Sequence, residues 1–163
     1  MTTAPGPSTG LPETIRLIEM VFPDSTNHYG TMFGGKVLDL MDRAAFVAAS
    51  RYAGLAMVTA STERVDFHVP VKAGHMVELE ARVVYAGRTS VTVKVTLFAQ
   101  HPQGGPRAHA TTGYFHMVAV DDQGRPMPVP SFTPVEAVDR EEWARAEALR
   151  LARRQAAVTE EAS

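Results

Sequence analysis

The chain has 163 residues, of which 45% are apolar and 21% are charged, and its formal net charge is −2 at pH 7. This length and composition are typical of one globular domain with its own hydrophobic core. A net charge this small gives no indication of a nucleic-acid or acidic-membrane partner. The absence of cysteine excludes disulfides, thiolate metal sites and a cysteine nucleophile.

The N-terminal segment, residues 1–12, is rich in Thr, Pro and Gly, and is predicted to be a disordered leader. It has no basic region followed by an apolar run, so it resembles neither a signal peptide nor a transit peptide. The apolar runs elsewhere are short and interrupted, and none is long enough to span a bilayer. We therefore expect a cytoplasmic protein that does not enter a membrane.

The first two elements differ in their hydrophobic pattern. A compact stretch at 14–22 favours a β-strand, and a proline and an aspartate end it. A turn-rich loop then continues to Thr31. The pair Gly34 and Gly35 opens the one long helical pattern, which runs to about Tyr52 and is followed by a glycine that is typical of a helix C-terminus.

Four further segments are predicted as strands, because apolar and polar residues alternate along most of them. They span residues 57–67, 76–86, 89–100 and 107–120. The connections are short, only Gly87–Arg88 in one case, and this favours antiparallel pairing because parallel strands need a long crossover. One long helix against an antiparallel sheet of about five strands is an α+β architecture. The charged, alanine-rich tail at 134–157 is predicted as a surface helix.

Asp42 stands out on the helical wheel of the long helix, because it falls on the apolar side between Leu38 and Phe46. A carboxylate there is costly unless another group satisfies it. One interpretation is a boundary residue that reaches solvent or a backbone donor. The other is a general base or nucleophile that faces a cleft. The wheel by itself leaves both open.

Several short motifs carry a family resemblance. The stretch from Pro23 to Asp42 contains an Asn, a Gly three residues later, then Phe-Gly-Gly and Met-Asp, which are Asn27, Gly30, Phe33, Gly34, Gly35, Met41 and Asp42. Matching segments follow in order at 58–59, 67–74 (FHVPVKAG), 87–90 (GRTS) and 118–130. Together they resemble the acyl-CoA thioesterases of the hotdog superfamily, in particular the YciA type and the cytosolic acyl-CoA hydrolases. The resemblance predicts one hotdog domain at 13–131, followed by a helical tail at 132–163.

The resemblance implies a fold and an activity. The fold would be a long central helix wrapped by an antiparallel sheet, assembled as a dimer or a trimer of dimers. The activity would be hydrolysis of an acyl-CoA thioester to a free acid and coenzyme A, without metal or organic cofactor. Two alternatives stay open: a non-catalytic acyl-CoA-binding hotdog module, and a thioesterase that acts on aryl-CoA or acyl carrier protein thioesters.

The resemblance also implies roles for individual residues. Asp42 would be the catalytic carboxylate, and Asn27 would position the water or the acyl carbonyl, from the neighbouring subunit. Backbone N–H groups near Gly34 and Gly35 are suited to stabilise the oxyanion, because a helix start leaves them unbonded. The residues expected beside coenzyme A are Arg88, Thr89 and Ser90, since arginine binds phosphates well. The alternatives are that Asn27 is only a turn residue and Arg88 only a hairpin arginine.

Overall fold

The computed structural model describes residues 11–162. The leader predicted at 1–12 lies outside the described residues except for its last two positions. The elements, in chain order, are β1 (Ile15–Met20), the 3-10 helix η1 (Pro23–Ser25), α1 (Gly34–Ala53), β2 (Ala56–Thr62), β3 (Met76–Ala86), β4 (Ser90–Gln100), β5 (Ala108–Val120) and α2 (Ala137–Glu161). None of the helices described in residues 11–162 is long and apolar enough to cross a membrane.

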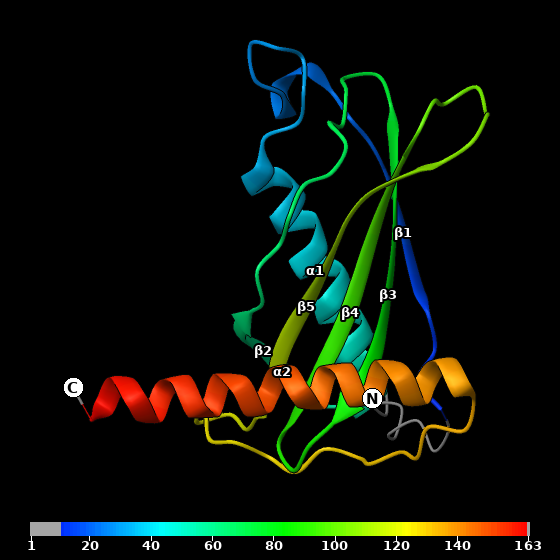
Figure 1. Cartoon of the computed structure of the whole chain (residues 1–163). Helices are drawn as coiled ribbons and strands as arrows, with labels where there is room; N and C mark the ends of the chain where they lie inside the picture. The colour runs from blue at the N-terminus through cyan, green and yellow to red at the C-terminus, as the bar shows by residue number, and fades with distance from the viewer. Residues whose placement is uncertain (1–10, 163) are drawn as a thin grey trace.

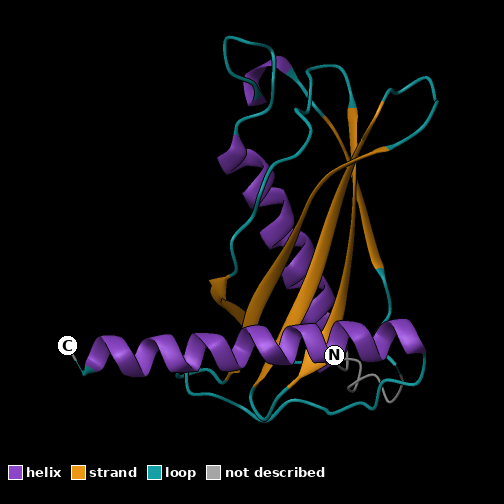
Figure 2. Ribbon diagram, in the orientation of Figure 1, coloured by secondary structure: helices purple, strands orange, loops and turns teal. Residues whose placement is uncertain are grey.

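The five strands form one antiparallel sheet in the order β1-β3-β4-β5-β2. The sheet curls around α1, which packs against one face and contacts all five strands. The helix α2 lies across the opposite face (Figures 1 and 2). This arrangement confirms the predicted α+β architecture and its hotdog form.

The long helix α1 buries a face that is mostly alanine and ends where the pattern predicted. Gly54 follows it in the left-handed conformation with φ of 63°, which glycine adopts without the cost of a Cβ. Small side chains let the helix approach the sheet closely, and the buried members of this face are Val37, Leu40, Met41, Ala44, Ala45, Ala48, Ala49, Tyr52 and Ala53. Leu38 and Phe46, which share the wheel sector of Asp42, are instead 37% and 48% exposed. The prediction that Leu38 belongs to the core-facing side is therefore wrong for a single chain, because Leu38 lines an open cleft beside β2 and does not enter the core.

The strand predicted at 57–67 is shorter than expected and ends at Thr62. Beyond it, the chain stays beside β5 without a regular ladder, since the backbone N–H of Glu63 donates to Tyr114 O at 3.0 Å and that of His68 donates to Ala110 O at 2.9 Å. It passes the start of α1, where the Phe67 ring lies 3.4 Å from the place that a Cβ on Gly34 would occupy. The prediction failed for 63–67 because an apolar alternation does not distinguish a strand from a segment that runs beside one with only scattered hydrogen bonds.

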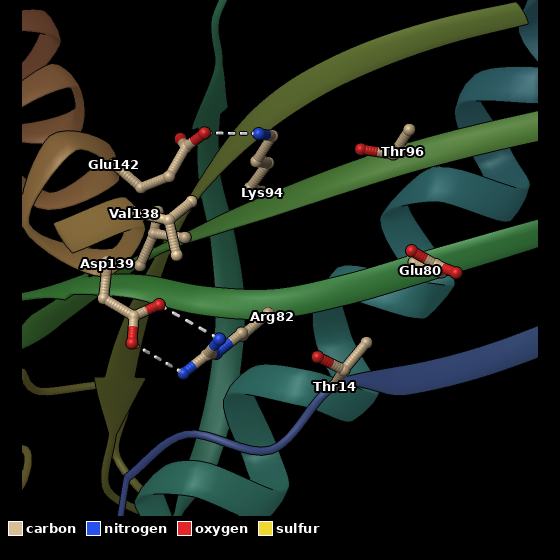
Figure 3. A pocket seen from close by; sticks show the side chains of 9 residues that line it. Thr14, Glu80, Arg82, Lys94, Thr96, Val138, Asp139 and Glu142 are labelled. Carbon is tan, nitrogen blue, oxygen red and sulfur yellow. Dashed lines mark hydrogen bonds and ion pairs between the residues drawn. The ribbon is translucent and has the colours of Figure 1, made fainter. Parts of the chain in front are cut away.

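The predicted C-terminal helix is confirmed as α2, and its packing ties it to the outer face of the sheet. Ala146 is fully buried there, and the ring centroids of Trp143 and Tyr85 are 4.5 Å apart. Figure 3 shows ion pairs beside this contact, from Arg82 to Asp139 at 3.0 Å and from Lys94 to Glu142. These partly buried pairs fix the N-terminal half of α2 on strands β3 and β4.

Candidate active site

Asp42 lies half-buried on the uncovered side of α1 and faces strand β2. The hydroxyl of Thr59 donates a hydrogen bond of 2.6 Å to Asp42 Oδ1. In the described part of the chain, Oδ2 of the same carboxylate has no hydrogen-bond partner. One oxygen is therefore oriented by the protein while the other is available to a ligand or a water molecule.

The carboxylate opens into a cleft between α1 and the end of β2, with a volume of about 320 Å³. The residues that line it are Gly35, Leu38, Asp39, Asp42, Thr59, Thr62 and Phe115. Asp39 is paired with Arg43, and this ion pair holds the pKa of the Asp39 carboxyl below its usual range. Asp42 is therefore the carboxylate of the cleft that no basic side chain neutralises.

The start of α1 has two unbonded donors, and the residue of one of them, Gly35, lines the same cleft whereas Gly34 does not. The first backbone hydrogen bonds of the helix run from Lys36 N and Val37 N to Phe33 O, at 2.9 and 3.1 Å. Among the described residues, no acceptor binds the N–H groups of Gly34 and Gly35. A Cβ on Gly35 would have no heavy atom within 4 Å, so the backbone is open to a ligand on this side. Donors at a helix start stabilise developing negative charge.

Asn27 does not line the cleft of its own chain. Its Oδ1 accepts three hydrogen bonds within the 27–31 loop, from Tyr29 N at 3.0 Å, Thr31 N at 3.2 Å and Thr31 Oγ1 at 3.1 Å. The Asn27 oxygen therefore stabilises the turn of this loop. In residues 11–162, its NH₂ group has no hydrogen-bond acceptor and remains available as a donor.

Arg88, Thr89 and Ser90 also lie away from the cleft. They form the β3–β4 hairpin, at the end of the sheet opposite to the Asn27 loop (Figure 1). Two backbone hydrogen bonds hold the hairpin in place. Val129 N donates to Arg88 O at 2.9 Å, and Ala119 N donates to Thr89 O at 3.0 Å. The Arg88 side chain is exposed. A single chain therefore brings together Asp42 and Gly35, but neither Asn27 nor the hairpin.

Thr59 is a site residue that the sequence motifs did not predict, and its hydroxyl lies against Asp42. Its segment was among those that carried the family resemblance, and this was the only available signal. Thr59 is 17 positions from Asp42, so no helical or strand periodicity relates them. Within residues 11–162, no three His, Asp or Glu side chains gather in an arrangement that could hold a metal ion.

Comparison with known sequences identifies the family. The family model described as the thioesterase superfamily matches residues 29–105. YkhA of Bacillus subtilis (strain 168), named an uncharacterized acyl-CoA thioester hydrolase, is 39% identical over 114 residues, which cover 70% of this chain and 66% of that protein. The cytosolic acyl coenzyme A thioester hydrolase of Mus musculus is 29% identical over 132 residues, which cover 80% of this chain and 35% of that protein.

Solved structures agree with the sequence comparison. A hexameric acyl-CoA thioesterase superposes with a TM-score of 0.83 at 38% identity, over 88% of this chain and 92% of that chain. The acyl-CoA hydrolase of Staphylococcus aureus, in complex with butyryl coenzyme A, coenzyme A and coenzyme A disulfide, has a TM-score of 0.81 at 36% identity, over 91% of this chain and 90% of that chain. Variants of that enzyme with alanine in place of one asparagine, one aspartate or one threonine have also been solved. With its curled sheet, its long helix and these similarities, the chain belongs to the thioesterase superfamily, among the acyl-CoA thioester hydrolases.

Proposed function

We propose that Asp42 is the catalytic carboxylate with which this enzyme hydrolyses acyl-CoA thioesters to a free carboxylic acid and coenzyme A. The observation that carries the proposal is the Asp42 carboxylate itself. One of its oxygens is held by Thr59 at 2.6 Å, and the other opens into a cleft beside an unbonded helix start. Thioester hydrolysis needs an activated nucleophile and donors for the oxyanion, and this cleft has groups suited to both.

The relatives support the choice of residues. The asparagine, aspartate and threonine replaced in the Staphylococcus aureus variants occur in the same order and at the same spacing as Asn27, Asp42 and Thr59 of this chain. The aspartate and the threonine of this set are in direct contact here. Asn27 is the one member that the single chain leaves outside the cleft.

Asp42 can act in either of two ways. As a general base it takes a proton from water, the resulting hydroxide attacks the thioester carbonyl, and the C–S bond breaks to release coenzyme A as the thiol. As a nucleophile it attacks the carbonyl itself, the C–S bond breaks and coenzyme A leaves as a thiolate that takes a proton from water; a second water molecule then hydrolyses the acyl-aspartyl anhydride to the free acid and regenerates Asp42. In both routes the carbonyl oxygen becomes an oxyanion. The backbone N–H of Gly35 is the donor within the cleft that is suited to bind it.

Asn27 completes the proposed site from a second copy of the chain. Its amide oxygen is occupied by the loop, while its NH₂ group has no hydrogen-bond partner among the described residues, so it is suited to donate to a substrate carbonyl or a water molecule. The exposed side of α1 with Leu38 and Phe46 provides an apolar surface for that copy. A dimer, or a trimer of dimers, would bring an Asn27 loop to each Asp42 cleft, and one similar thioesterase is hexameric.

The hairpin residues Arg88, Thr89 and Ser90 are proposed to bind the coenzyme A moiety. The support is the exposed Arg88 side chain, which lies on a turn held by backbone hydrogen bonds. Arginine binds phosphate through paired N–H donors.

A cytoplasmic location is proposed from the murine relative, which is named cytosolic.

The test is thiol release from acyl-CoA by purified wild type, Asp42→Asn and a control, Asp122→Asn. Asp42→Asn keeps the size of the side chain but removes the base, and we expect turnover to fall by about 10²–10⁴. Asp122 lies in the exposed 121–125 turn, so the control loses the same charge far from the cleft and keeps its activity. Near wild-type turnover by Asp42→Asn would rule out its catalytic role.

A substrate panel distinguishes the alternatives. Acyl-CoA esters of different chain lengths, an aryl-CoA ester and an acyl carrier protein thioester are compared by kcat/KM, because differential transition-state binding defines specificity. Preference for acyl-CoA is expected. Binding of acyl-CoA without any thiol release would instead indicate a binding module.

A further inference from the structure

A bulge in β2 orients the wall of the cleft. Thr59 pairs with Met117 of β5, but Ser61, two residues later, pairs with His116, so the register shifts by one residue between them. Because side chains alternate along a strand, an unbulged strand would place Thr59 and Ser61 on the same face. The bulge instead turns Thr62 toward the cleft with Thr59, and both line it.

Directly behind this bulge, on the outer face of the sheet, a chain of polar side chains is buried. His116 is 3% exposed and Thr92 is 1% exposed. His116 Nε2 lies 2.7 Å from Glu63 Oε1, and His116 Nδ1 lies 3.0 Å from Thr92 Oγ1. Glu63 is the residue after Thr62, so this chain of hydrogen bonds ties the end of β2 to strands β5 and β4.

The hydrogen-bond roles follow from the chemistry of the three groups. A carboxylate only accepts, so His116 Nε2 carries a hydrogen and donates to Glu63. Burial lowers the pKa of His116, and the nearby guanidinium groups of Arg153 and Arg150 on α2 act in the same direction, while Glu63 opposes them. The neutral imidazole then accepts at Nδ1 from the Thr92 hydroxyl. Every nitrogen of the ring is satisfied.

The bulged register leaves a buried hydroxyl without a hydrogen bond, and the hydrogen bonds among Glu63, His116 and Thr92 stabilise this register in compensation. Among the described residues, Ser61 Oγ is one of the buried side-chain atoms without a hydrogen-bond partner, and an unsatisfied buried hydroxyl is unfavourable. A slip of one residue would remove the bulge and exchange the two faces, which would turn Thr62 outward and Glu63 toward the cleft. The hydrogen bond of Glu63 to His116 exists only in the bulged register.

We propose that Glu63, His116 and Thr92 are positioning residues of the active site, which hold the end of β2 in the register that turns Thr62 toward Asp42. They touch no substrate and act through the backbone of β2. The inference rests on the proposed function, because it assigns these residues to the geometry of the Asp42 cleft.

The first experiment compares kcat and KM of wild type, Glu63→Ala and Glu63→Gln, at a temperature where denaturation curves show every variant folded. Glu63→Ala leaves His116 Nε2 without its acceptor, and we expect kcat to fall about tenfold. Glu63→Gln keeps an acceptor oxygen of the same reach, so it should restore kcat to within about twofold of wild type. Wild-type kcat in Glu63→Ala would overturn the proposal.

The second experiment tests whether the effect passes through Thr62. Thr62→Ala is introduced into wild type and into Glu63→Ala, and the two changes in kcat are compared. If the network sets the register, Thr62→Ala should lower kcat in wild type and have little further effect in Glu63→Ala. Equal effects in both backgrounds would mean that Glu63 acts only on overall stability, and would overturn the proposal.

Two further variants make the result decisive. Tyr114→Phe removes another hydrogen bond from the outer face of β5, the one to Glu142 Oε2 at 3.0 Å, and should leave kcat unchanged. If Glu63→Ala does not fold, Thr92→Val takes its place in both experiments. This variant removes only the hydroxyl that donates a hydrogen bond to His116 Nδ1. A wild type that releases no thiol would refute the proposed function itself, whereas an active wild type with unaffected variants would refute only the positioning role.

Discussion

His116 is a residue whose buried, neutral state links stability to pH. Its pKa lies below the ordinary value of 6.5, chiefly because burial disfavours the charged ring. The unfolded chain therefore binds a proton at a higher pH than the folded chain does. Protonation favours unfolding, so the contribution of neutral His116 is fully present above about pH 6.5 and is lost as the pH falls below it.

This loss of stability at low pH leads to a prediction for His116→Gln, whose side chain retains an N–H donor for Glu63 but does not titrate. The free energy of unfolding of wild type should fall more steeply than that of His116→Gln as the pH is lowered from 7.5 to about 5. Denaturant titrations of both proteins at several pH values measure the difference. Parallel curves over this range would show that His116 is not the group responsible.

Arg88 is a second residue with a testable role. Its guanidinium is exposed on the β3–β4 hairpin and has no carboxylate partner among the described residues. A phosphate contact remote from the thioester binds ground and transition states alike, so Arg88→Ala should raise KM several-fold and leave kcat nearly unchanged. The effect should vanish for a short thioester that lacks the nucleotide. An equal effect on both substrates would exclude nucleotide binding by Arg88.

At the scale of elements, α2 depends on one small buried residue. Ala146 is fully buried where the helix crosses the sheet, and a larger or charged side chain there has no space. Ala146→Asp should lower the free energy of unfolding by about 2–4 kcal/mol, because it buries an unpaired charge. Ala144→Asp, two residues away on the exposed side, is the matched control and should change it by less than about 0.5 kcal/mol.

The only tryptophan of the chain, Trp143, lies on α2, so its fluorescence emission follows the packing of this helix on the sheet. Its ring packs against Tyr85 and Phe132, with centroids 4.5 and 5.0 Å away. Its emission should shift to the red in Ala146→Asp and stay unchanged in Ala144→Asp. Unchanged emission and stability in Ala146→Asp would mean that α2 is not docked on the sheet in solution.

At the scale of the whole molecule, the separation of Asn27 from the cleft of its own chain predicts complementation between copies. Asn27→Ala and Asp42→Ala should each be inactive alone. Mixed assemblies would contain some sites with an intact Asn27 from one copy and an intact Asp42 from the other. Refolding an equimolar mixture should therefore recover up to about a quarter of the wild-type activity, as expected for random pairing in a dimer with two shared sites.

Light scattering on wild type measures the oligomeric state in the same buffer as the complementation experiment. An active monomer at micromolar concentration would contradict the shared site. So would a mixture that stays as inactive as its components, provided that mass spectrometry shows that mixed assemblies formed.

The sequence by itself determined the elements and the place of the carboxylate. Hydrophobic periodicity reports local geometry, so it located α1 and most of the strands, and the helical wheel singled out Asp42 as a carboxylate on an otherwise apolar side. The same patterns missed the end of β2, because residues 63–67 alternate like a strand but lie beside β5 without a continuous hydrogen-bond ladder. They also placed Leu38 on the core side, because a wheel does not show which sectors the sheet covers.

Only the tertiary structure decided which side chains meet. Thr59 and Asp42 are 17 positions apart, and His116 and Glu63 are 53 apart, so their contacts depend on strand pairing and on the bulge after Thr59. A one-residue shift in register reverses every side chain beyond it, and no local pattern in the sequence specifies that shift. For this reason the motif indicated the chemistry of the cleft, whereas packing determined its geometry.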